Sequence, residues 1–335
     1  MASDGIVLFA KPSGQTSFNS LFTIKKALST KKVGHTGTLD SFADGLLVVC
    51  VGSCTHLVSY ITEFDKEYDA IIKFGEETDT LDPTGEVVRT ADLPSLADLT
   101  RSIKKWTGNV EQFPPAYSAI HVDGKRLSDL AREGKTAEIP SRKITVFASD
   151  LLEVRTQDGK SFSANNDLFE HDLENQKILY AHVHFSVSKG TYIRSLARDI
   201  ANDCNSCAHL VALRRTRVGN FKLEDAAGAK LLPPFSIDTL GNFVPQESVS
   251  SIKVIECIKD VDENFSELCG FHNLKLKNEF IQDFKNGKPL RKTMFAGENS
   301  FDENELYAVF CENAFSGLVT FSDGKLRYCF VRAQK

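Results

Sequence analysis

The sequence predicts a mixed α/β (α+β) fold in two parts, a large first domain and a small β-rich second domain. The chain has 335 residues, more than one hydrophobic core usually organises. Strand-like and helix-like apolar patterns alternate along residues 1–232, whereas short apolar runs separated by Gly and Asn dominate the C-terminal part. Between them, residues 233–251 turn to Pro, Gly, Asn and Ser, as linkers do. We therefore expect domains at 1–232 and 252–335.

Hydrophobic periodicity predicts the elements of the first domain in order. Residues 17–28 form a helix in this interpretation because Leu21, Ile24 and Leu28 fall on one face, and Ser17 can cap it. Residues 46–51 are continuously apolar, which indicates a buried strand. The same patterns predict the later elements, which are strand 68–74, helix 95–106, strand 179–187 and helix 192–203.

Two further segments complete the prediction. Residues 155–177 are polar and rich in Asn, Asp and Glu, and we expect a hairpin excursion between strands whose role the sequence does not give. After the linker, the apolar runs 306–311, 317–321 and 326–331 predict the strands of the small domain.

Charge is distributed unevenly along the chain. The net charge is −5, which by itself argues against a nucleic-acid partner. Residues 5–39, however, contain five lysines and no acid. Because phosphate contacts depend on the local field, such a block favours a surface that faces RNA, although a solvated charge run explains Lys25 and Lys26 equally well. The second basic block comprises Lys189, Arg194, Arg198, Arg214, Arg215, Arg217 and Lys222.

Several classes of protein are disfavoured. No apolar run approaches the ~20 residues of a membrane helix, and no signal sequence is visible, so we expect a cytoplasmic protein without membrane contact. The eight cysteines are scattered, which is typical of free thiols in a reducing compartment. Cys204 and Cys207 form the one CxxC pair and lack a second pair, so we expect no metal site.

Residues 34–45, with the sequence GHTGTLDSFADG, are the most informative stretch. Three glycines bracket one His, two Thr and two Asp, and the buried strand follows at once. Glycine allows close approach to the main chain, so the stretch predicts a shaped loop that presents a carboxylate. Its glycine spacing matches neither of the nucleotide-binding patterns GxxxxGK(S/T) and GxGxxG, so a nucleotide cofactor is not expected.

This loop resembles the catalytic loop of the TruB family, the pseudouridine synthases that make pseudouridine-55 in the T arm of tRNA. Four more stretches resemble the family in the correct order, namely KPSG at 11–14, KEY at 66–68, QFPPAYSA at 112–119 and KGTYIR at 189–194. The resemblance implies a pseudouridine synthase core with a large, mostly antiparallel sheet flanked by helices. It also implies a small C-terminal RNA-binding domain of the PUA type. Ser41 and Phe42 depart from the usual Pro-Leu pair, which removes rigidity but no chemical group.

The resemblance assigns the chemistry to three residues. Asp40 matches the catalytic aspartate, whose ionised carboxylate stabilises positive charge at C1′ when the glycosidic bond breaks. Arg194 matches the arginine that pairs with it and would hold it ionised and oriented. Tyr68 matches the tyrosine that stacks on the target base and offers an oxygen for the proton lost from C5. Taken without the family, Arg194 reads as a surface helix residue and Tyr68 as a core aromatic of a strand.

Further residues are expected around the substrate. His35 matches a histidine proposed to fill the place of the everted base. Lys11 matches a lysine near the active site, and its alternative role is to pack the Lys-Pro turn. Tyr192 and Leu213 are expected near the base, or else in the core. Phosphate contacts are expected from a last group, Lys125, Arg126, Arg214 and Arg215.

The predicted function is therefore isomerisation of a tRNA uridine to pseudouridine by base flipping, with no cofactor and no metal. The expected partner is the T stem-loop of tRNA, bound by a monomer without a guide RNA. Two alternatives stay open: a tRNA-binding or tRNA-folding protein whose catalysis is secondary or lost, and a guide-dependent synthase acting on ribosomal RNA.

Overall fold

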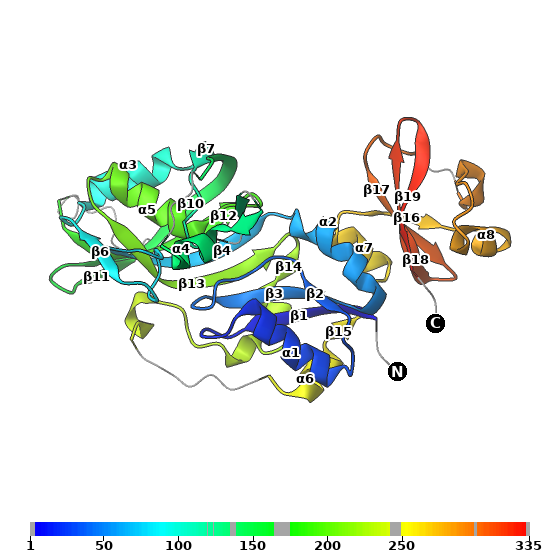
Figure 1. Cartoon of the computed structure of the whole chain (residues 1–335), viewed down its shortest axis with the longest axis horizontal. Helices are drawn as coiled ribbons and strands as arrows, with labels where there is room; N and C mark the ends of the chain where they lie inside the picture. The colour runs from blue at the N-terminus through cyan, green and yellow to red at the C-terminus, as the bar shows by residue number, and fades with distance from the viewer. Residues whose placement is uncertain are drawn as a thin grey trace.

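The computed structural model describes residues 4–332 apart from 119, 123, 135–138, 164–174, 242–248 and 298–299. One long sheet with helices packed against it makes up most of the molecule, and a smaller sheet stands beside it at the C-terminal end (Figure 1). The predicted mixed α/β fold is confirmed.

The large sheet has eleven strands among the described residues, in the order β11-β10-β12-β4-β13-β3-β1-β15, with β14 on β13, β2 on β3 and β7 on β10. Its pairings are antiparallel except that of β13 with β3. The strands are β1 (Gly5–Lys11), β2 (Val33–His35), β3 (Asp44–Val51), β4 (Lys66–Phe74), β7 (Gly108–Gln112), β10 (Arg142–Thr156), β11 (Ser161–Ser163), β12 (Ile178–Val187), β13 (Ala208–Val218), β14 (Phe221–Lys222) and β15 (Ile258–Lys259).

The predicted helices are present within a residue or two of their expected bounds, with one difference in capping. The cap of α1 is Thr16, whose hydroxyl accepts a hydrogen bond from the Asn19 amide. The expected cap, Ser17, instead bonds the backbone of Leu39. The α-helices are α1 (Ser17–Ala27), α2 (Val58–Thr62), α3 (Leu96–Lys105), α4 (Leu127–Arg132), α5 (Ile193–Asp203), α6 (Ser251–Glu256), α7 (Glu263–Leu268) and α8 (Ile281–Lys285). The 3₁₀ turns are η1 (Gly52–Leu57), η2 (Leu223–Asp225), η3 (Ala229–Leu231), η4 (Ile237–Thr239), η5 (Asn278–Phe280) and η6 (Lys292–Met294).

Separate hydrophobic clusters lie on either side of the β13–β3 junction. Helices α3 and α5 bury Leu99 and Leu196 against β4 and β12, whereas α1 buries Ile24 against β1 and β3. The junction itself is short, with Arg214 opposite Asp44 and Arg215 opposite Gly45. Gly45 has φ +112°, and a Cβ there would lie 2.4 Å from the Arg215 carbonyl oxygen, so the two strands can approach only because this residue is glycine. The loop between β2 and β3 therefore sits at the meeting point of both halves.

The smaller sheet is formed by the last four strands, β16 (His272–Lys275), β17 (Leu306–Cys311), β18 (Ala314–Ser322) and β19 (Lys325–Val331). Phe315 and Leu318 of β18 share a core cluster with Leu46 and Val48 of β3. Residues 258–259 still pair with β1. The domain boundaries given above remain predictions.

Two small hairpins stand apart from the large sheet, and one excursion extends from its edge strands. The pair β5 (Glu76–Thr78) and β6 (Val87–Thr90) and the pair β8 (His121–Val122) and β9 (Lys125–Arg126) are small two-stranded sheets. The expected excursion at 155–177 begins as a turn from β10 into β11, and most of its remainder lies outside the described residues. No described helix is long and apolar enough to cross a membrane.

Candidate active site

The loop between β2 and β3 is held by a buried lysine. Lys11 Nζ lies 2.6 Å from the Ala43 carbonyl oxygen and 2.7 Å from that of Gln15, with the Pro12 and Ser41 carbonyls at 2.9 and 3.5 Å. Burial lowers the pKa of Lys11 to about 8, against the opposing pull of Asp44 and Asp40. Lys11 therefore fixes the loop from within the protein, which favours the packing alternative over direct substrate contact.

Arg215 and Ser17 hold the other side of the same loop. Arg215 is buried and donates to the carbonyls of Leu46, Gly37 and Thr38 at 2.8, 3.1 and 3.4 Å. The Ser17 hydroxyl bonds both the carbonyl and the amide of Leu39, each at 2.9 Å. Backbone groups on both sides of Asp40 are thus fixed by side chains that come from distant elements.

Asp40 and Arg194, expected to pair, lie in contact. Arg194 Nε is 2.8 Å from Asp40 Oδ2, and its Nη2 donates to Oδ1 at 3.2 Å. The guanidinium is 5% exposed and the Asp40 side chain 36%. A planar two-point contact orients the carboxylate while leaving part of it open to solvent.

A second carboxylate supports Arg194, and sequence reasoning did not find it. Asp82 Oδ2 lies 3.6 Å from Arg194 Nη1, which also donates to the Thr80 carbonyl at 2.8 Å. Asp82 is buried and accepts from the Thr84 amide at 2.9 Å, an Asx-type turn between β5 and β6. The signal available was the Asp-Pro-Thr-Gly sequence of that turn, but nothing in it points to an arginine on α5.

The Asp40–Arg194 pair lines a cleft of about 570 Å³. Tyr68 and Leu213 come from the neighbouring strands β4 and β13, and Tyr192 lies just before α5. Gln112 bonds both backbone groups of Tyr192. Burial raises the pKa of the Tyr192 hydroxyl and lowers that of Lys66, a further lining residue, to about 8. The cleft thus places the Asp40 carboxylate beside aromatic and apolar side chains, a combination suited to a planar polar ring, and its lining also carries cations such as Lys66.

The other predicted residues lie in different surroundings. His35 ends β2 and accepts from the Gly37 amide through Nδ1 at 3.3 Å, and burial lowers its pKa. Arg214 makes two contacts of 2.7 Å with Asp44, which favours a structural role over phosphate binding. Lys125 and Arg126 belong to β9, but their side chains lie outside the described part of the structure.

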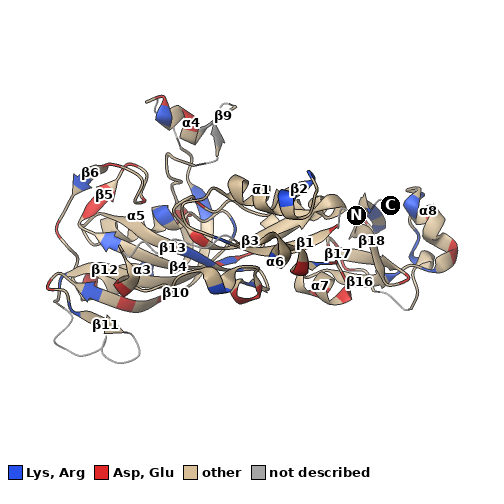
Figure 2. Ribbon diagram, turned by 90° about the horizontal axis from the view of Figure 1, so that it is seen from below, with Lys and Arg blue, Asp and Glu red and all other residues tan. Residues whose placement is uncertain are grey.

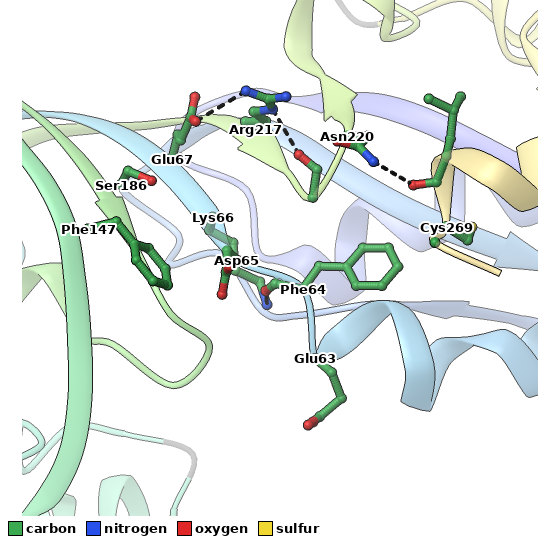
Figure 3. A pocket seen from close by; sticks show the side chains of 13 residues that line it. Glu63, Phe64, Asp65, Lys66, Glu67, Phe147, Ser186, Arg217, Asn220 and Cys269 are labelled. Carbon is green, nitrogen blue, oxygen red and sulfur yellow. Dashed lines mark hydrogen bonds and ion pairs between the residues drawn. The ribbon is translucent and has the colours of Figure 1, made fainter. Parts of the chain in front are cut away.

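A second cavity, of about 580 Å³, lies at the start of β4 (Figure 3). Its lining includes Phe147 and Asn220, and its Glu67 faces Arg217 across 3.3 Å. Neither Asp40 nor Arg194 lines this cavity. The cleft containing that pair is therefore the candidate active site.

Comparison with known proteins shows the family of this chain. Residues 25–193 match the family model described as "TruB family pseudouridylate synthase (N terminal domain)". A protein of Treponema denticola named tRNA pseudouridine synthase B is 42% identical, with 96% of each chain covered. Proteins of the same name from Treponema pallidum and Borreliella burgdorferi are 35% and 42% identical, covering 94% and 73% of this chain and 94% and 80% of their own. This chain belongs to the TruB family of pseudouridylate synthases.

Solved structures share the fold. A chain from an H/ACA RNP bound to a substrate RNA containing 2'-deoxyuridine has a TM-score of 0.61 and 19% identity, covering 99% of this chain and 84% of its own. A chain from a Cbf5-Nop10-Gar1 complex has a TM-score of 0.62, 21% identity and the same coverages. At such identities the likeness concerns the fold alone.

Proposed function

We propose that this chain converts a uridine of tRNA, at position 55 in the T arm, to pseudouridine without a cofactor. The observation that carries the proposal is the Asp40–Arg194 contact of 2.8 Å at the wall of a cleft large enough for one nucleoside. The relatives named tRNA pseudouridine synthase B, which align over most of the chain, support tRNA as the substrate.

In the proposed mechanism the Asp40 carboxylate lies beside C1′ of the everted uridine. Cleavage of the C1′–N1 bond leaves positive charge at C1′ and negative charge on uracil, and the carboxylate stabilises the former. Uracil then turns and C5 bonds to C1′. Loss of the proton from C5 and gain of a proton at N1 then restore the conjugated uracil ring. Arg194 orients the carboxylate, and Tyr68 stacks on the base and offers an oxygen toward that proton.

Eversion of the base costs a few kcal/mol, and a side chain that fills the vacated place lowers the cost. We assign this part to His35, whose loop neighbours are fixed by Arg215 and Lys11. The enzyme acts as a monomer, in the cytoplasm, and needs no guide RNA. Its eight cysteines are free, in keeping with a reducing compartment.

The decisive experiment incubates purified protein with an unmodified T-stem-loop transcript and no guide RNA, followed by nucleoside analysis. The wild type should convert one uridine. Asp40→Asn should lower kcat by more than about a thousandfold, because the carboxylate charge at C1′ is lost, while RNA binding stays within about threefold. Modification by Asp40→Asn would contradict the assignment of Asp40. Binding without modification would favour the RNA-binding alternative, and modification only after a guide RNA is added would favour the guide-dependent one.

A further inference from the structure

We infer that the outer face of α1 is a stacking surface for RNA, with Phe18 and Phe22 as two aromatic platforms beside the catalytic cleft. The inference rests on the proposed action on RNA and adds a specific contact surface to it.

The two phenylalanines are exposed although their helix has an apolar inner face. Leu21 and Ile24 of α1 are buried against β1 and β3, whereas Phe18 is 70% exposed and Phe22 69%. Positions four apart lie on neighbouring turns of one helix face, so the two rings are adjacent. Large aromatic side chains bury more apolar area than most others. Two of them exposed side by side therefore indicate a surface that is stabilised when a binding partner covers it.

The surroundings of the two rings are cationic. Lys25 Nζ lies 5.3 Å from the centroid of the Phe18 ring. Surface lysines follow along the same segment, and none of them forms an ion pair with a described residue; they are Lys25, Lys26, Lys31 and Lys32. Residues 5–39 contain no acid. Protein interface cores are depleted of lysine, whereas aromatic rings set among cations fit a polyanion whose bases carry π faces.

The position of α1 relates this surface to the substrate. Phe18 directly follows Ser17, whose hydroxyl holds Leu39 next to Asp40. Figure 2 places α1 on the same side of the large sheet as β9 and α4, which carry segments of the predicted substrate-binding region. An RNA strand that delivers a nucleotide to Asp40 therefore has its neighbouring nucleotides within reach of this side of the molecule. Unpaired bases next to an everted nucleotide have free faces, and an aromatic ring can stack on any base.

The test separates aromatic stacking from mere apolar contact. Phe18→Leu/Phe22→Leu keeps the apolar character and removes the rings, and Phe18→Tyr/Phe22→Tyr keeps the rings. For the T-stem-loop transcript, the leucine variant should raise Kd and KM at least about tenfold, with kcat unchanged, because both stacking rings are lost. The tyrosine variant should stay within about twofold of wild type. The slope of log Kd against log salt should be unchanged in both, since no phosphate contact is removed.

A matched control is available on the neighbouring helix. Ile252 and Ile255 of α6 are exposed aliphatic residues, at 67% and 51%, and α6 packs with α1 around a shared core. Ile252→Ser/Ile255→Ser should leave Kd and KM unchanged. An equal loss in this control, or a leucine variant that binds like wild type, overturns the inference.

Two further results have a defined meaning. If the wild type neither binds nor modifies RNA, the proposed function fails and the inference falls with it. If the wild type modifies RNA and the leucine variant is normal, only the inference fails. Sedimentation that shows a wild-type dimer and a monomeric Phe18→Ser/Phe22→Ser variant assigns the surface to a second copy of the chain, which also overturns it.

Discussion

Two aspartate–arginine pairs anchor the same loop four residues apart, and they differ in their access to solvent. Arg214 closes on Asp44 through two contacts of 2.7 Å, and the side chains are only 12% and 8% exposed. Arg214 also donates to the Pro233 carbonyl and lies over the Phe235 ring. Asp40 meets Arg194 in a similar two-point contact, yet its carboxylate opens into the cleft.

The comparison shows that pairing with an arginine does not by itself decide whether a carboxylate is open to the cleft or closed off from solvent. In the Asp44 pair both oxygens are committed to one guanidinium, so the pair joins β3 to β13 across the sheet junction. In the Asp40 pair both oxygens also meet one guanidinium, which the protein fixes through Thr80, Tyr117 and Asp82, but the carboxylate is 36% exposed and open to the cleft. Access to the cleft is the difference that matters for chemistry.

Breaking the Asp44–Arg214 pair should lower the free energy of unfolding more than breaking the Asp40–Arg194 pair. Asp44→Asn leaves the Arg214 guanidinium buried beside a neutral amide, so we expect the free energy of unfolding to fall by about 3 kcal/mol. Urea unfolding measures this, with Asp40→Asn as the reference. Equal destabilisation by the two substitutions would contradict the distinction drawn between the pairs.

Replacing the guanidinium of the open pair should act on turnover. Arg194→Lys cannot make the planar two-point contact, and we expect kcat to fall about a hundredfold while Kd for RNA changes less than about threefold. Arg198→Lys, one turn further along α5 and paired with Asp199, is the matched control and should be nearly neutral. Equal losses in kcat and in affinity would assign Arg194 to a phosphate contact.

Removing the Asp82 carboxylate, which supports Arg194, should lower kcat less than replacing Arg194 itself. Asp82→Asn removes the second carboxylate from the guanidinium but keeps the turn, so we expect kcat to fall about tenfold with KM unchanged. Asp92→Asn, at an exposed position nearby in the sequence, should leave both constants unaltered. A raised KM at normal kcat would place Asp82 in substrate binding instead.

The smallest effect for each unit of change is a pH dependence of stability from Lys11, which lies near both aspartates. Its folded pKa is about 8 because of burial, against an ordinary value of 10.5. The unfolded chain therefore holds more protons between these values, and the contribution of Lys11 to stability rises with pH across that window. The stability of wild type relative to Lys11→Met should increase by up to about 1 kcal/mol per pH unit above pH 8. A constant difference between pH 7 and 10 would contradict this.

Much of the fold and the central pair were predictable from the sequence. Apolar periodicity placed α3, α5, β4 and β12 within two residues, since these elements pack through regular faces. Asp40 and Arg194 were found through motifs that resemble a known family. Their roles in catalysis remain predictions.

The rest depends on tertiary contacts that leave little local trace. From their place in a basic block, Arg214 and Arg215 are expected to contact RNA phosphates. Neighbouring positions of β13 face opposite sides of the sheet, however, and both guanidiniums find partners inside the protein. The sequence predicts Ser17 as the cap of its helix, but Ser17 bonds Leu39 instead because the loop that carries Asp40 passes directly beside it. Asp82 acts on an arginine more than a hundred residues away, which no local pattern encodes.

The glycine at residue 45 determines how the two halves of the large sheet are positioned relative to each other. It permits the contact between β13 and β3, which is the one parallel strand pair of the large sheet among the described residues, and the loop carrying Asp40 is tied to one half by Lys11 and to the other by Arg215. A substitution that adds even a single methyl group at residue 45 would displace one half of the sheet relative to the other. The carboxylate and the tyrosine ring would then move out of alignment, although neither had been altered.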